Sequence, residues 1–103
     1  MGRLSRDRGR NFEYAVAKFM GKGCRRSIFR PHDTEGHPLF VFECKKRKTL
    51  AIFLLKWWSQ ACKATEKGKL PALVMAEYRQ PVKDALCVIR LEDLRDLINK
   101  TEL

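Results

Sequence analysis

The stretch FVFECKKRK at residues 40–48 decides the predicted fold, because apolar and charged side chains alternate in it from Phe42 to Lys45 and further cations follow. Successive side chains of a strand point to opposite faces. Phe42 and Cys44, with Phe40, are therefore expected to face a core, while Glu43 and Lys45 project from the other face. The stretch predicts a strand over residues 39–45 that carries a carboxylate and an ammonium group side by side.

A second acid, Asp33, lies ten positions before Glu43 in the segment RPHDTEGHP at residues 30–38. Asp is common in turns for conformational reasons alone. A hairpin of strands 24–30 and 39–45 would nevertheless bring Asp33 to the edge of the strand that carries Glu43.

Oxygen ligands near a cation suit phosphodiester hydrolysis, which needs an activated water molecule and relief of negative charge in the transition state. Mg²⁺ is a hard ion that prefers carboxylate and carbonyl oxygens. We expect Asp33, Glu43 and the backbone carbonyl of Cys44 to bind Mg²⁺, with Mn²⁺ as a substitute. Lys45 is expected to orient the attacking water or to neutralise the phosphate, so that Asp33, Glu43 and Lys45 form a catalytic set.

The net charge of +10 on 103 residues predicts a polyanionic partner, and nucleic acid is the commonest one. A solvated basic surface and a ribosome-type structural protein are the alternatives on charge alone. With 45% hydrophobic and 33% charged residues, the chain is expected to form a single globular domain over residues 1–103.

The cysteines and the apolar runs predict a soluble, intracellular protein. The four cysteines have no zinc-type spacing and are expected to be buried free thiols in a reducing compartment. The longest apolar run, residues 50–55, is too short to span a membrane, and the Arg-rich N-terminus does not look like a secretory signal. A glycine-rich phosphate loop is absent, so no nucleotide cofactor is expected.

The periodicity of the remaining chain predicts an α/β domain in the order α-β-β-α-β-β-α, with a mixed sheet and helices against it. After a loose basic arm at residues 1–8, Asn11 is expected to cap a helix that ends at Gly21. Glu13 would then lie in the first turn, where the helix dipole alone explains an acid, although it could also face the site. A helix is expected over residues 50–67, and its regular part begins near residue 54. Two strands follow, one at 70–76 that is buried on both faces and one at 85–89. The last expected element is a helix at 92–98 with Leu94, Leu97 and Ile98 inward.

Taken together, these motifs resemble the PD-(D/E)XK nuclease superfamily, and most closely its small archaeal and phage Holliday junction resolvases. The resemblance rests on the segments GRNFE at 9–13, RS at 26–27, FECK at 42–45, WWSQA at 57–61 and LPALV at 70–74, together with Asp33. An extra residue separates Pro31 from Asp33, which leaves Glu35 as an alternative to Asp33.

The resemblance implies a restriction-endonuclease-like core, a central mixed sheet flanked by helices, and a place in the cytoplasm of a prokaryotic or phage-infected cell. It also implies a homodimer with two magnesium sites that nicks opposed strands of a four-way DNA junction, and Glu13 as a further catalytic acid and possible metal ligand. Trp57 and Trp58 fit packing or a dimer contact better than base stacking. The residues expected to contact DNA are Arg3, Arg6, Arg8, Arg10, Arg26, Ser27, Arg30, Lys46, Arg47, Lys48 and Gln60, and His32 has a weaker claim to touch the phosphate.

Two alternatives to a junction-resolving nuclease remain open. One is a repair or replication nuclease of the same fold that acts on flaps, ends or other branched DNA. The other is a non-enzymatic nucleic-acid-binding protein, although such a protein has no reason to place two carboxylates near a polyanion.

Overall fold

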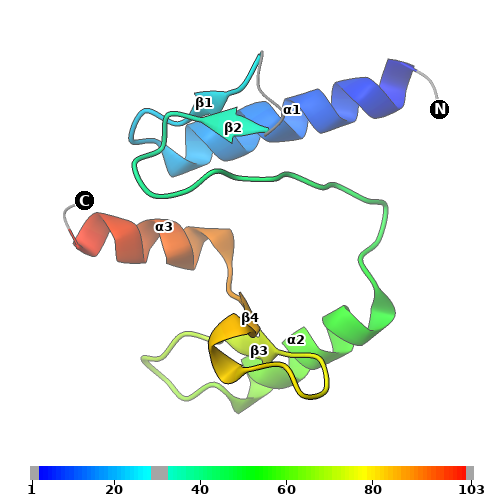
Figure 1. The fold of residues 1–103 in the computed structure, drawn as a ribbon, viewed down its shortest axis with the longest axis vertical. Helices are drawn as coiled ribbons and strands as arrows, with labels where there is room; N and C mark the ends of the chain where they lie inside the picture. The colour runs from blue at the N-terminus through cyan, green and yellow to red at the C-terminus, as the bar shows by residue number, and fades with distance from the viewer. Residues whose placement is uncertain (1–2, 29–32, 102–103) are drawn as a thin grey trace. The chain divides into compact units, whose positions relative to one another are not determined.

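The computed structural model describes residues 3–28 and 33–101, and their side chains from Arg8 onward. The elements follow one another as α1 (Arg3–Met20), β1 (Arg25–Arg26), β2 (Thr34–Glu35), α2 (Ile52–Ala64), β3 (Leu73–Met75), the short 3₁₀ helix η1 (Val82–Asp84), β4 (Leu86–Val88) and α3 (Leu91–Lys100) (Figure 1). They belong to two compact units, Met1–Lys48 and Thr49–Leu103. The described chain is thus a small α+β protein with three α-helices and two antiparallel sheets of two strands each.

Helix α1 begins much earlier than its apolar pattern predicts. It starts at Arg3, so that residues 3–8 are helical where a loose arm is expected, and Asn11 is an interior residue rather than the N-cap. Arg is a good helix former, and one interior glycine costs a helix only about 1 kcal/mol, so Gly9 does not stop it. The predicted end is confirmed: Gly21 adopts a φ of 66° and donates its N–H to the carbonyl of Ala17 at 3.1 Å.

The hairpin of the first unit pairs different residues from those predicted. β1 pairs antiparallel with β2 through Arg25 and Glu35 and through Arg26 and Thr34. Residues 36–51 form no helix or strand, so the strand predicted at 39–45 is wrong. The expected alternation of faces is confirmed only in part. Phe42 and Cys44 are half-buried, and Val41, Glu43 and Lys45 are exposed, but Phe40, which is expected to face the core, is 39% exposed.

Side chains of the first unit form the hydrogen bonds to residues 42–44 that a neighbouring strand would otherwise form. Phe42 donates its N–H to the hydroxyl of Thr34 at 2.9 Å, and that hydroxyl lies 3.5 Å from the carbonyl of Phe42. Cys44 donates its N–H to the carboxylate of Asp33. Thr34 is fully buried, and the core residues of α1, which are Val16, Ala17 and Met20, are buried as well.

A close backbone approach follows β2. Gly36 adopts a φ of 87°, and a Cβ atom on it would overlap the carbonyl oxygen of Gly23. The turn that ends α1 therefore lies directly against the turn that follows β2, and only glycine fits at Gly36.

In the second unit, α2 contacts β3 of a sheet that has only two described strands. β3 and β4 pair antiparallel, with Val74 opposite Cys87. The prediction that the strand at 70–76 is buried on both faces is wrong, because Val74 is 63% exposed. A two-stranded sheet with one helix against it covers one face and leaves the other open.

The boundaries of the remaining helices agree with the sequence pattern in part. α2 begins at Ile52, slightly before the predicted start of its regular part, and α3 covers the predicted C-terminal helix. Ile98 is buried as expected, whereas Leu97 is 45% exposed.

Three further sequence-based expectations concern the whole described chain. One central mixed sheet is expected, but the described strands form two separate sheets. The cysteines are free as predicted, although three are only half-buried and Cys87 is exposed. Within residues 3–28 and 33–101, no helix has both the length and the apolar character needed to cross a membrane.

Replacing Gly36 by Ala is expected to destabilise the first unit far more than replacing Gly21 by Ala. Both glycines have a left-handed backbone conformation, so both substitutions cost about 1 kcal/mol of strain. Only at Gly36 does the added methyl group also collide with backbone, whereas nothing lies within 4 Å at Gly21. The free energy of unfolding, measured by urea denaturation followed by circular dichroism, should show the difference; equal losses would contradict the close approach.

Replacing Thr34 by Val is expected to open the 42–44 segment locally. Val keeps the shape of Thr but leaves the part-buried N–H of Phe42 without its acceptor, at a cost of about 1–3 kcal/mol. Hydrogen exchange of the Phe42 amide should accelerate roughly 5- to 150-fold. The exposed Thr49 is the control, since Thr49→Val should leave that exchange rate unchanged.

Candidate functional site

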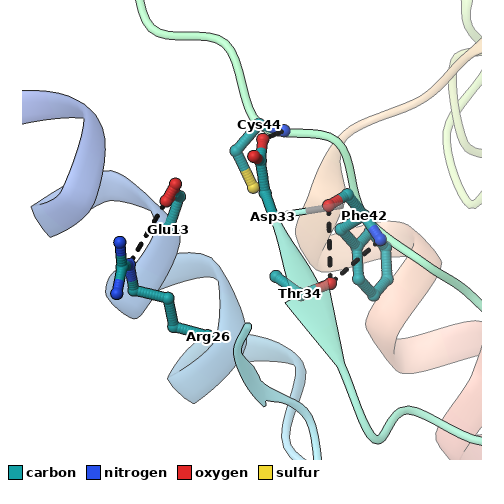
Figure 2. A network of polar contacts seen from close by, with 6 residues as sticks. All are labelled: Glu13, Arg26, Asp33, Thr34, Phe42 and Cys44. Atoms are coloured by element: carbon teal, nitrogen blue, oxygen red, sulfur yellow. Dashed lines mark hydrogen bonds and ion pairs between the residues drawn. The ribbon is translucent and has the colours of Figure 1, made fainter. Parts of the chain in front are cut away.

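The candidate site is centred on Cys44, where Asp33 meets the segment that carries Glu43 and Lys45. The carboxylate Oδ2 of Asp33 accepts the N–H of Cys44 at 2.5 Å (Figure 2). This bond joins the end of β2 to a residue eleven positions later. Asp33 is therefore placed beside the predicted catalytic stretch, as the sequence leads us to expect.

Glu43 and Lys45 project together from the exposed face of their segment. The Nζ atom of Lys45 lies 3.2 Å from Oε1 of Glu43, and the two side chains are 71% and 57% exposed. Exposed ion pairs contribute at most about 1 kcal/mol to stability. Both groups can therefore exchange this contact for another charged partner at little cost.

Glu13 is engaged elsewhere in the first unit. Its Oε2 atom lies 3.3 Å from Nε of Arg26, and both side chains are largely buried. The guanidinium of Arg26 also lies 5.4 Å from the centre of the Tyr14 ring. Glu13 and Arg26 thus hold β1 against α1, on the opposite side of the view from the Thr34 and Phe42 bonds in Figure 2.

The thiol of Cys44 responds to all three predicted acids. Burial raises the pKa of Cys44 from 9.0 to about 11, and the negative charges of Asp33, Glu13 and Glu43 add to this rise, with a smaller effect of Cys24. The folded state consequently holds this proton more tightly than the unfolded chain does. Its contribution to stability is complete below pH 9 and disappears as the pH rises through about 11.

The donor atoms fit a magnesium ion that takes most of its ligands from water and substrate. Among the residues that the structure describes, no three His, Cys, Asp or Glu side chains come together to hold a metal ion. Glu13 is therefore not brought into a metal-binding group. Mg²⁺ is commonly bound through one or two carboxylates, with water and substrate phosphates as its other ligands. The carboxylates of Asp33 and Glu43 and the backbone carbonyl of Cys44 supply oxygen atoms of the kind that this arrangement uses. Lys45 lies beside Glu43.

Glu35, the alternative to Asp33, has a different environment. Its Oε1 atom lies 3.4 Å from Nε of Arg25, across the pair of strands β1 and β2. Asp33 rather than Glu35 contacts the backbone of the stretch that carries Glu43 and Lys45.

The residues predicted to contact DNA are divided by the structure. Several are exposed in the first unit, namely Arg8, Arg10, Lys46, Arg47 and Lys48, and Gln60 is exposed on α2 in the second unit. Arg26 is half-buried in its contacts with Glu13 and Tyr14, and Ser27 is buried. The side chains of Arg3 and Arg6, and residues Arg30 and His32 altogether, lie outside the described part of the chain.

Two residues that shape the site were not recognised from the sequence. Thr34 binds the backbone of Phe42, and the Nδ1 atom of His37 accepts the N–H groups of Leu39 and Phe40 at 3.1 and 3.2 Å. The His37 ring also packs edge-on against Phe42, with 5.5 Å between the ring centres. Only the turn signal of Gly36, His37 and Pro38 pointed to this arrangement.

Comparison of the chain with protein-family models, curated proteins and solved structures found no match. The functional interpretation consequently depends on the site residues, their geometry and the motif resemblance.

Removing the charge of Asp33 is expected to lower the pKa of the Cys44 thiol. Asp33→Asn keeps an oxygen acceptor for the Cys44 N–H but removes the nearest charge that opposes ionisation. The rate of Cys44 alkylation by iodoacetamide, followed by mass spectrometry from pH 8 to 12, should have its midpoint near pH 11 in the parent and at a lower pH in this variant. Glu92→Gln, in α3 of the second unit, is the control and should not move the midpoint; an unchanged midpoint in Asp33→Asn would contradict the arrangement.

Proposed function

We propose that the protein is a magnesium-dependent endodeoxyribonuclease that hydrolyses phosphodiester bonds in branched DNA, with the four-way junction as its substrate. The observation that carries the proposal is the hydrogen bond from the Cys44 amide to Asp33. It places the upstream acid beside the Glu43 and Lys45 stretch. The net charge of +10 further supports a polyanionic substrate.

Each residue of the candidate site has a distinct role in this proposal. Mg²⁺, when bound, would supply Lewis-acid stabilisation of the charge that develops on the phosphate. Asp33 and Glu43 would hold the ion, together with the Cys44 carbonyl. The Lys45 ammonium, which is exposed and already beside Glu43, would orient the attacking water or pair with a phosphate oxygen.

A restriction-endonuclease-like fold and a homodimer are part of the same proposal. The second unit exposes large apolar side chains on α2 and on its sheet, which suits a contact with a second copy. These side chains include Ile52, Phe53, Leu55, Trp57, Val74 and Leu86. Paired nicks on opposed strands of a junction require two sites, which a homodimer would provide.

The contacts of the carboxylates favour a second candidate, a nucleic-acid-binding protein without hydrolytic activity. Each of the three acids already has a partner: Glu13 has Arg26, Asp33 has the Cys44 amide, and Glu43 has Lys45. These bonds give the acids a structural explanation that requires no catalysis. The nuclease remains the preferred proposal because the Glu43 and Lys45 pair is exposed and holds no other element in place.

Neutralising Glu43 or Asp33 is expected to abolish cleavage while leaving DNA binding intact. Glu43→Gln and Asp33→Asn should each lower the cleavage rate of a labelled four-way junction in Mg²⁺ at least about 100-fold, because each removes charge from a metal ligand. Salt-sensitive binding should persist, since the cations remain. Chelation by EDTA should stop the parent, and Mn²⁺ should restore it.

Three comparisons make this test discriminating. Glu66→Gln, at an exposed acid of the second unit, should cleave at the parent rate. Glu35→Gln separates the two candidate acids, and a loss confined to it would transfer the role from Asp33 to Glu35. Flap and linear substrates distinguish junction selectivity from broader nuclease activity. Absence of metal-dependent cleavage on every substrate would favour the non-enzymatic alternative.

A further inference from the structure

We propose that a basic hollow beside α1 binds a backbone phosphate of the DNA a few nucleotides from the scissile bond. The hollow has a volume of about 440 Å³ and is lined by Arg8 of α1 and by Lys46, Arg47 and Lys48. Sites that hold small ligands commonly measure about 300–1,000 Å³. All four residues belong to the first unit, the same unit as Asp33, Glu43 and Lys45.

The charges of this basic hollow favour an anion with several oxygen atoms. Every lining residue is a cation. Within residues 8–28 and 33–101, no carboxylate forms an ion pair with any of the four. Like charges that share one hollow repel each other, and a bound phosphate relieves that repulsion. Guanidinium and ammonium groups also supply the donors that phosphate oxygens accept.

Lys46 is held in place at the basic hollow by a contact with α1. Its Nζ atom lies 5.4 Å from the centre of the Phe12 ring, at the distance of a cation–π interaction. The helix and the segment after the candidate site therefore meet here through a charged group.

The chain length limits how far the hollow lies from the catalytic stretch. Lys46 follows Glu43 by three residues and Lys48 follows it by five. An extended chain spans at most about 3.6 Å per residue, so these cations lie within about 11–18 Å of Glu43 along the chain. One DNA strand carries a phosphate about every 3.4 Å of helix axis. A strand cleaved at Glu43 would thus place a phosphate in the hollow within about five nucleotides.

This inference rests on the proposed function for the choice of DNA as the polyanion, but it goes beyond catalysis. The hollow recognises phosphate through charge alone, so its binding is independent of base sequence and of divalent metal. Binding to a short linear duplex in EDTA therefore tests the hollow apart from hydrolysis.

The test compares two double variants that remove the same charge. Arg47→Gln/Lys48→Gln alters the hollow, and Lys83→Gln/Lys100→Gln alters exposed residues of the second unit. Fluorescence anisotropy at several salt concentrations gives the slope of log affinity against log salt. The hollow variant should lose up to about 0.9 from the magnitude of the slope, because that is the contribution of one phosphate contact, and the control should lose much less.

Additional measurements separate a loss of phosphate binding from a loss of folding. Circular dichroism checks folding, and Arg8→Gln, which changes one exposed helix position, should also lower the magnitude of the slope, by no more than about 1, even if the double variant misfolds. Equal slopes in hollow and control variants would overturn the inference. The same variants are also tested for binding to phosphatidylglycerol vesicles, and a loss of binding to the vesicles without a loss of binding to DNA would overturn it as well. If the protein cleaves no DNA but the hollow variants still lower the salt slope, the proposed nuclease activity is contradicted and the phosphate-binding role of the hollow is supported.

Discussion

The hydrogen bonds between the side chains of Asp33 and Thr34 and the backbone of Phe42 and Cys44 determine the arrangement of the first unit. A regular hairpin would join these segments by main-chain bonds alone. Here the hydroxyl and the carboxylate satisfy the N–H groups of an extended segment that has no strand partner of its own. The same bonds that satisfy the backbone also bring an acid to the Glu43 and Lys45 stretch. Structure and candidate chemistry therefore depend on the same two side chains.

The acids of the first unit differ in how firmly they are held. Glu13 and Arg26 form a largely buried pair between α1 and β1, and removing either partner would leave the other uncompensated. Glu43 and Lys45 form an exposed pair that solvent screens. Glu13 therefore helps to hold α1 and β1 together, whereas Glu43 and Lys45 remain accessible to solvent.

The sequence predicted those features that local pattern determines. The end of α1 at Gly21, the helix α3 and the alternating faces around Glu43 follow from periodicity and turn chemistry. The pairing of β1 with Thr34 and Glu35 could not be predicted, because those two residues carry no run of strand-forming side chains. In the site, the proximity of Asp33 to the stretch that carries Glu43 and Lys45 was predicted, but the predicted hairpin does not form and a side-chain bond brings the two together instead. The Glu13 and Arg26 pair was not, since it depends on how a helix and a strand pack together.

The raised pKa of Cys44 also bears on how the protein meets oxidants. Peroxides attack the thiolate rather than the thiol, and Cys44 stays protonated at neutral pH because burial and three carboxylates oppose its ionisation. Cys87, in contrast, is exposed on β4. Oxidative damage should therefore begin in the second unit and spare the residue whose backbone binds Asp33. The three carboxylates that oppose ionisation of Cys44 thus also protect its sulfur atom from oxidation.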